Sequence, residues 1–316
     1  MRRALWFAAL MLAAPAQAQP KAPQRLDDHT VLVPGGVQPG RQPDGNSVLI
    51  EGPEGIVVID TGRHAAHADA ILAAAADKPI VGIVNSHWHL DHVSGNLRLK
   101  AAFPGARVYA SDAIDAALTG FLAKGAEDGR AAIASGTLPP GLAEDVRGDI
   151  ATVAEGTRLR PDTVIAHSLV MQLAGRTLAV GLAPHAATAG DVWIYDVSSR
   201  RVIAGDLVTL PAPFLDTACP EGWEAALDRI GALDFTSLVP GHGPVMTRAD
   251  FTAWHLAFTS FLDCANGERP METCAGGWMN AARRWLSEDE AGGFADMAGY
   301  YGALIRGGQL ARNCPA

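Results

Sequence analysis

A short stretch of the chain concentrates side chains that bind metal ions. His87, His89, Asp91 and His92 lie within six residues of one another, although the whole chain has only 10 histidines. His87 and His89 are two positions apart, so on an extended segment they point to the same side and can share one cation. Asp91 and His92 follow on the next turn and point to a neighbouring position. The pattern indicates a metal site. Zinc suits imidazole and carboxylate ligands best, and iron or manganese are the other candidates.

The segments around this cluster place it at the end of a strand. Residues 48–50 and 56–60 are short apolar segments around a Gly-Pro turn, which predicts a hairpin, and residues 64–77 are typical of an alanine-rich helix. The apolar run 80–84 predicts another strand, and the polar cluster 85–96 follows it directly. A polar loop that contains histidines by chance is the alternative reading. The strand before the cluster and the helix-start residues at its end disfavour it.

The rest of the chain repeats the order of strands followed by helices. Residues 111–158 have a mostly helical pattern. Further strands are expected at 163–166, 169–173, 177–182, 192–195, 202–204 and 237–239, and helices at 221–232, at 249–264 and beyond residue 276. Two sheets with helices outside them are the economical way to cover this much apolar strand, so we predict an α+β fold. We expect one domain over residues 19–316, with a helical insert at about 111–158 and a helical extension at about 249–316.

The order of these motifs resembles the metallo-β-lactamase fold, a four-layer αββα sandwich. The likeness covers roughly residues 45–245. It rests on the His-x-His-x-Asp-His run, on Asp60-Thr61-Gly62 after the hairpin, on Gly205-Asp206 at a strand end, and on the loop that carries His242. The stretch 205–220 also resembles exported members linked with sulfur-oxidation or quinoprotein systems.

The resemblance implies a binuclear centre. One metal takes two histidines of the cluster and a later histidine, the other takes the aspartate and the last histidine of the cluster, and a carboxylate lies between them. By position these ligands are His87 and His89 for the first metal, Asp91, His92 and His242 for the second, and Asp206 as the bridge. A metal-bound hydroxide would attack the substrate, Asp91 would pass a proton to the leaving group, and Asp60 would fix a ligand from behind. For Asp60, a purely structural turn role is the alternative.

The sequence departs from the family at one ligand. There a histidine usually precedes Thr-x-Gly-Asp, whereas here Ala187 stands at that place. His185 lies two residues earlier, and two places back on an extended segment keeps the same side, so we predict that His185 takes over the ligand role. The alternatives are His167, or a more open first site with His87, His89 and Asp206 alone. We interpret His64 and His67 as surface histidines of an exposed helix face.

Three classes of function fit this site. An aspartate at the bridging position is similar to glyoxalase II and lactonases, so the leading hypothesis is a zinc hydrolase, with two zincs per chain, acting on a small ester, thioester, lactone or amide. A mononuclear iron persulfide dioxygenase of the same fold is the second. A metal-binding accessory protein without catalysis is the third. Metal analysis separates the first two hypotheses, because one expects two zincs and the other one iron.

Charge and the N-terminal segment limit the partners. The formal net charge of −9 argues against nucleic acid and leaves a small-molecule substrate. Residues 1–18 have a basic start, a short apolar run and an Ala-x-Ala end, typical of a cleavable signal peptide, so the mature protein should begin at Gln19 without a membrane anchor. This places the protein in the periplasm or outside the cell.

Export changes how the cysteines are interpreted. The chain has 4 cysteines and an exported protein meets an oxidising compartment, so we expect disulfides. Cys264 and Cys274 flank a turn-rich segment and are typical of a staple across a helix–loop–helix. If they pair, Cys219 and Cys314 form the second bond. A four-cysteine zinc site is the weaker alternative, since the chain has no Cys-x-x-Cys pair.

Overall fold

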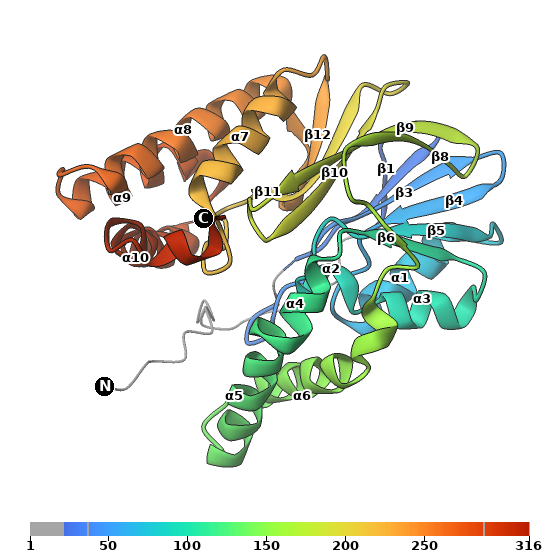
Figure 1. Cartoon of the computed structure of the whole chain (residues 1–316), viewed down its shortest axis with the longest axis horizontal. Coiled ribbons are helices and arrows are strands. Elements are labelled where there is room, and N and C mark those ends of the chain that lie inside the picture. The colour runs from blue at the N-terminus through green and yellow to red at the C-terminus, as the bar shows by residue number, and fades with distance from the viewer. Residues whose placement is uncertain (1–21, 37, 287, 316) are drawn as a thin grey trace. The chain divides into compact units, whose positions relative to one another are not determined.

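The computed structural model describes residues 22–36, 38–286 and 288–315 and divides the chain into two compact units (Figure 1). The N-terminal unit runs to Ile165 and includes Leu173–Gly175, and the C-terminal unit holds Ala166–Gln172 and the chain from Arg176 onward. The predicted signal peptide and the start at Gln19 lie outside the described residues. The prediction of a single domain stays a prediction, and each unit is described by itself.

A seven-stranded sheet forms the frame of the N-terminal unit, with its strands in chain order. They are β1 (Gln24–Arg25), β2 (Thr30–Val33), β3 (Ser47–Gly52), β4 (Gly55–Ile59), β5 (Ile80–Val84), β6 (Arg107–Ala110) and β7 (Thr163–Val164). β1 to β4 pair antiparallel, and β4 to β7 pair parallel. Because β4 and β5 are parallel, the segments that leave them emerge at the same edge of the sheet. The segment with Asp60 therefore lies beside the histidine cluster.

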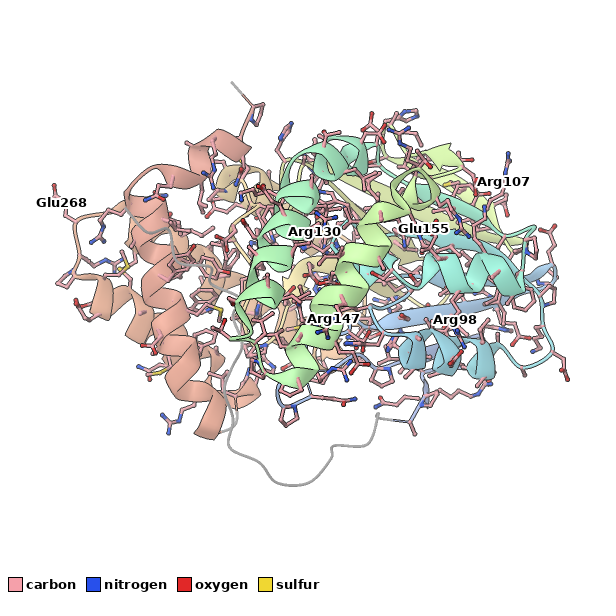
Figure 2. All side chains as sticks on the ribbon, turned by 90° about the horizontal axis from the view of Figure 1, so that it is seen from below. Arg98, Arg107, Arg130, Arg147, Glu155 and Glu268 are labelled. Carbon is pink, nitrogen blue, oxygen red and sulfur yellow. A yellow bond between two sulfur atoms is a disulfide. The ribbon has the colours of Figure 1, made fainter. Side chains whose placement is uncertain are left out.

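Helices cover this sheet and form the predicted insert. They are α1 (Ala65–Ala75), α2 (Leu90–Val93), α3 (Asn96–Ala102), α4 (Ala113–Thr119), α5 (Phe121–Ser135), α6 (Pro140–Ala154) and the 3-10 turn η1 (Gly156–Leu159). α5 ends at Gly136, which has φ +67°, and α6 begins with a proline in its first turn, a position where proline's missing N–H costs nothing. Gly129 lets the two helices approach, since a Cβ there would lie 2.7 Å from Val146. Arg130 and Arg147 are exposed on these helices (Figure 2).

The C-terminal unit contains a six-stranded sheet in the order β13-β12-β11-β10-β9-β8. Its strands are β8 (Leu169–Leu173), β9 (Arg176–Pro184), β10 (Gly190–Asp196), β11 (Arg201–Thr209), β12 (Ser237–His242) and β13 (Met246–Thr247). β11 and β12 pair parallel, whereas β9 with β10, β10 with β11 and β12 with β13 pair antiparallel. All nine residues of β11 are buried, which fits a central strand.

An aromatic core holds the helices of this unit. They are α7 (Pro220–Gly231), α8 (Arg248–Asn266), α9 (Met271–Ala282), η2 (Arg283–Trp285), α10 (Glu288–Arg306) and η3 (Gln309–Asn313). Trp223, Phe258 and Trp278 are fully buried in the core that joins α7, α8 and α9, and their rings contact one another through Phe258. The structure contains both expected disulfides, Cys264–Cys274 between α8 and α9 and Cys219–Cys314 between the start of α7 and the C-terminal segment.

Both units combine a sheet with helices, so the predicted α+β class is confirmed. The predicted hairpin is β3–β4, and the predicted insert is α4 to α6. Among the helices that the structure describes, none is long and apolar enough to cross a membrane.

Candidate metal centre

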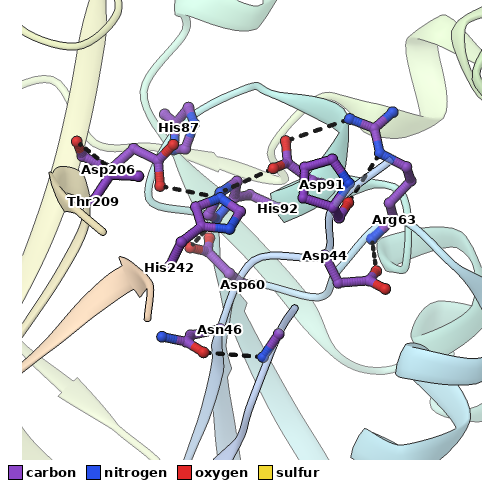
Figure 3. Close-up of polar contacts among 12 residues, drawn as sticks. Asp44, Asn46, Asp60, Arg63, His87, Asp91, His92, Asp206, Thr209 and His242 are labelled. Carbon is purple, nitrogen blue, oxygen red and sulfur yellow. Dashed lines mark hydrogen bonds and ion pairs between the residues drawn. The ribbon is translucent and has the colours of Figure 1, made fainter. Parts of the chain in front are cut away.

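The segment after β5, a loop and the short helix α2, gathers four metal-binding side chains inside the N-terminal unit, and Figure 3 labels three of them, His87, Asp91 and His92. The ring centroid of His87 lies 4.5 Å from that of His89 and 4.3 Å from that of His92. The Oδ2 of Asp91 is 3.7 Å from the Nε2 of His92. His87, Asp91 and His92 are buried and His89 is partly exposed. The predicted cluster therefore exists, and the assignment of its members as ligands stays a prediction.

Two buried asparagines fix the path of this loop. Asn85 directly follows β5 and accepts a hydrogen bond from the side-chain amide of Asn96 at 2.7 Å, and the Thr61 hydroxyl donates to Asn96 at 2.9 Å. Gly95 packs against the segment that follows β4, because a Cβ there would lie 2.1 Å from the carbonyl oxygen of Thr61. Both ends of the histidine loop are thereby tied to the neighbouring parallel strand.

Asp60 lies directly behind the cluster. Its Oδ1 accepts a hydrogen bond from the backbone N–H of Ser86 at 2.7 Å, and its Oδ2 accepts one from the Ser86 hydroxyl at 2.6 Å. The same Oδ2 lies 2.8 Å from the Nδ1 of His92. Asp60 is 2% exposed and has φ +59°, a backbone conformation that is maintained only where the surroundings enforce it. A carboxylate on the Nδ1 of histidine leaves Nε2 as the atom that would bind a metal.

Sequence reasoning missed Arg63, which contacts Asp91. Arg63 Nη2 lies 3.6 Å from Asp91 Oδ1, and Nη1 lies 2.5 Å from Asp149 on α6. Burial opposes the charged form of Arg63, but the carboxylates of Asp149 and Asp91 outweigh it and raise its pKa. Burial raises the pKa of Asp149, against the effect of Arg63. The four-residue spacing of Asp145 and Asp149 on a predicted helix indicates two carboxylates on one face of that helix. Nothing in the sequence identified Arg63 as a partner of this face.

The interpretation of His64 and His67 as surface histidines is wrong. His64 precedes α1 with Nδ1 2.8 Å from Asp44 Oδ2 and Nε2 3.0 Å from Asp145 Oδ1. Burial alone would lower the pKa of His64, but the hydrogen bond and charge of Asp44 raise it. His67 is buried, and its Nε2 lies 2.8 Å from the Ser47 hydroxyl. His64 thus faces Asp145 of α6, and His67 faces Ser47 of β3.

The C-terminal unit brings Asp206 and His242 together. Asp206 lies in β11 and His242 ends β12, and the parallel pairing of the two strands places His242 Nε2 3.6 Å from Asp206 Oδ1 (Figure 3). Glycine is required at position 241, because a Cβ there would lie 1.9 Å from Asp206 Oδ1. This steric need accounts for the Pro-Gly-His-Gly run around His242.

His185 turns toward the C-terminal segment. It follows β9 with φ +52°, and its Nδ1 lies 3.2 Å from the carbonyl oxygen of Asn313. In the described part of the chain it belongs to no group of three or more metal-binding side chains. Ala187 is buried in the turn between β9 and β10 and offers no ligand atom. His185→Ala tests the ligand role predicted for His185.

The chemistry of the donor set fits a divalent metal such as zinc. Three imidazoles and one carboxylate lie together in the N-terminal unit, and oxygen and nitrogen donors of these types bind zinc in proteins. His87 and His92 both have Nδ1 in a side-chain contact, with Ser86 and Asp60 respectively. Ligand histidines are usually oriented in this way, through the nitrogen that does not bind the metal.

Comparison with known proteins identifies the family. The model of the metallo-beta-lactamase superfamily matches residues 40–242, more than half of the chain. The chain belongs to this superfamily, and the predicted fold is confirmed.

Relatives within the family include sulfatases. The linear primary-alkylsulfatase of Pseudomonas sp. (strain ATCC 19151) is 28% identical over 229 residues, which cover 63% of this chain and 42% of the relative. The chain thus spans less than half the length of that enzyme. Among solved structures, a metallo-beta-lactamase family protein from Thermus thermophilus matches at 17% identity and TM-score 0.58, covering 90% of this chain and 95% of that one. A double mutant of the sec-alkyl sulfatase PisA1 matches at 16% and 0.57, covering 93% of this chain and 52% of that one.

Proposed function

We propose that the protein is a metal-dependent hydrolase that acts on an ester. The observation that carries the proposal is the cluster of His87, His89, Asp91 and His92 in one short segment after β5, with three of the four side chains buried and Asp60 on the Nδ1 of His92. A purely structural loop does not need three imidazoles and a carboxylate in contact with one another. Membership of a superfamily that includes metal-dependent hydrolases supports the same function.

The ligand set follows the family resemblance and is part of the proposal. His87, His89, Asp91 and His92 would hold zinc together with Asp206 and His242, as a binuclear centre. Bound zinc would lower the pKa of water toward neutrality and polarise the bond under attack. The protein's own contribution is to hold these ligands in fixed positions. The carboxylate of Asp91 would also carry the proton that the leaving group needs.

A sulfate ester of an aliphatic alcohol is the substrate class that the relatives favour. The identity of 28% to a linear primary-alkylsulfatase supports it, whereas the match to the sec-alkyl sulfatase concerns the fold alone. A carboxylic ester, thioester, lactone or amide is the alternative within the same hydrolytic class. Cleavage of either ester type needs the same activated water, so the metal centre serves both.

The test combines metal analysis with a panel of esters. We expect two zincs per chain in protein purified without chelators, and hydrolysis of alkyl sulfates or carboxylic esters. In His87→Ala we expect the loss of both the zinc content and the hydrolysis. His29→Ala is the matched control, because His29 is exposed on the N-terminal unit. One iron per chain with oxygen consumption on a persulfide would instead indicate a dioxygenase. Bound metal without turnover on any of these compounds would indicate an accessory protein.

We infer that the protein acts outside the cytoplasm. Two disulfides in the C-terminal unit support this location, because such bonds persist in oxidising compartments. The intact mass of the protein from its host tests it. A mature chain that begins at Gln19 and has no free thiol is expected, and retention of Met1 would contradict export by a cleaved signal.

A further inference from the structure

We propose that Arg63 is a positioning residue for Asp91, and that it transmits the position of the helical insert to the metal ligands. The inference rests on the proposed function, because it assigns Asp91 to the metal centre. The observation behind it is independent of that function: one guanidinium, 11% exposed, links Asp149 of α6 to Asp91 inside the N-terminal unit, and Figure 3 shows its contact with Asp91.

Three fixed contacts define the position of the guanidinium. Nη1 donates to Asp149 on α6, Nε donates to the carbonyl oxygen of Pro43 at 3.2 Å, and Nη2 lies 3.6 Å from Asp91 Oδ1. The backbone N–H of Arg63 also donates to Asp44 at 2.7 Å. A planar guanidinium held at two of its nitrogens cannot rotate its third away from Asp91 without breaking a hydrogen bond.

The two oxygens of Asp91 therefore have different surroundings. Oδ1 faces Arg63 at 3.6 Å, and Oδ2 faces the Nε2 of His92 at 3.7 Å. The side chains of Arg63 and Asp91 are 11% and 10% exposed, so water screens the pair only weakly. The cation beside Oδ1 thus orients the carboxylate so that Oδ2 turns toward the ligand histidines.

The carboxylate of Asp149 balances the positive charge of Arg63. Asp149 is 19% exposed and contacts Arg63 more closely than Asp91 does, so the Arg63–Asp149 pair is close to neutral as a unit. A neutral unit does not repel a divalent metal as a lone guanidinium would. Its effect on Asp91 is then mainly geometric, which makes the proposal testable by removing the whole pair.

The decisive variant is the double substitution Arg63→Met with Asp149→Asn, which removes a positive and a negative charge together. Zinc affinity of the full chain, measured by competition with a chromophoric chelator, should fall by roughly 10- to 100-fold, the range found when a group that orients a ligand is lost. Arg63→Lys keeps the charge but not the planar fork, and should show a smaller loss. With a substrate in hand, kcat should fall while KM changes little.

A matched control lies one turn away on the same helix. Arg41→Met with Asp145→Asn removes another ion pair of α6, and the contacts of Asp145 are with Arg41, Gln42 and His64. This variant should lose thermal stability but bind zinc as the wild type does. An equal loss of zinc affinity in the control would show that α6 acts only through general stability and would overturn the proposal.

Two further outcomes keep the test decisive. Wild-type zinc affinity in the Arg63→Met/Asp149→Asn variant would overturn the proposal directly. If that variant does not fold, Arg63→Lys decides in its place, and wild-type affinity there would likewise overturn the proposal. Failure of the proposed function looks different, since the wild type would then bind zinc and hydrolyse no ester, while the effect of Arg63 on zinc affinity would still be seen.

Discussion

Substitution of Asp60 by asparagine should disable His92 as a ligand without unfolding the protein. The change keeps the size and shape of the side chain, and asparagine adopts positive φ readily, so the φ of +59° at this position is retained. The amide oxygen can still accept the bond from Ser86 N–H that Oδ1 now accepts at 2.7 Å. The NH2 group then faces His92 Nδ1 in place of an oxygen 2.8 Å away.

Two contacts of Oδ2 reverse, those with the Ser86 hydroxyl and with His92 Nδ1, and the contact with His92 sets the magnitude. An amide NH2 donates to Nδ1, so the neutral ring must carry its proton on Nε2, where a metal would bind. Zinc can bind Nε2 only after the ring has changed to the other tautomer, which lowers the zinc affinity by roughly 10- to 100-fold. Because each factor of ten is about 1.4 kcal/mol, the cost is about 1.4 to 2.8 kcal/mol. The alanine variant is less informative, because it leaves buried donors unsatisfied at roughly 1–3 kcal/mol each.

Zinc competition and nitrogen NMR of the His92 ring test this reasoning together. Asp60→Asn should show weaker zinc binding, a proton on Nε2 and a melting temperature close to that of the wild type. Asp250→Asn is the control, because Asp250 completes the capping box of α8 and accepts from Thr247. It should lower stability without changing zinc affinity. Wild-type zinc affinity in Asp60→Asn, with the proton on Nε2, would refute the argument.

Three further predictions concern stability. The pKa of His64 is raised, so its pairs with Asp44 and Asp145 stabilise the fold below the ordinary histidine pKa of about 6.5. This stabilisation is lost as the pH rises through the pKa that His64 has in the folded state. The free energy of unfolding in urea should therefore fall over that pH range, and it should fall less in His64→Gln. Gly62→Ala should lower the melting temperature, because Gly62 has φ +75° and the added Cβ would lie 2.3 Å from His67. Loss of the Cys219–Cys314 disulfide, which closes the longer loop of 95 residues, should cost about 4–5 kcal/mol in the chain-entropy treatment, read as a lower denaturation midpoint in a Cys219→Ser/Cys314→Ser variant.

The elements that the sequence predicted well are those with a local signal. The turn of the hairpin β3–β4 is formed by the turn-favouring sequence Gly-Pro-Glu-Gly. Helices α7 and α8 begin and end within one or two residues of their predicted bounds. Strand β2 was missed, since Thr30–Val33 is only four residues long and carries no turn signal of the hairpin type. Its place in the sheet depends on pairing with β3, more than ten residues away.

In the candidate site, too, the residues with a local signal were predicted and the others were not. His87, His89, Asp91 and His92 could be predicted because one loop carries all four, so their proximity needs no tertiary contact. Arg63 could not be predicted, because its carboxylate partner on α6 is 86 residues away in sequence. Hydropathy and spacing carry no record of a contact between such distant positions. The interpretation of His64 and His67 was wrong for the same reason, since their partners Asp145 and Ser47 are 81 and 20 residues away in sequence.

The parallel pairing of β4 with β5 explains why groups distant in sequence support the same ligands. Thr61 N–H donates to the carbonyl oxygen of His92 at 2.8 Å, and Gly95 N–H donates to that of Gly62 at 3.1 Å, so the segment leaving β4 runs along the ligand loop that leaves β5. Asp60 and Arg63 are the two ends of that segment, one contacting His92 and the other Asp91. A change in the β4–β5 register would therefore move both supporting side chains at once. Substitutions at either end of the segment should perturb Asp91 or His92, the adjacent side chains that we propose as ligands of one metal.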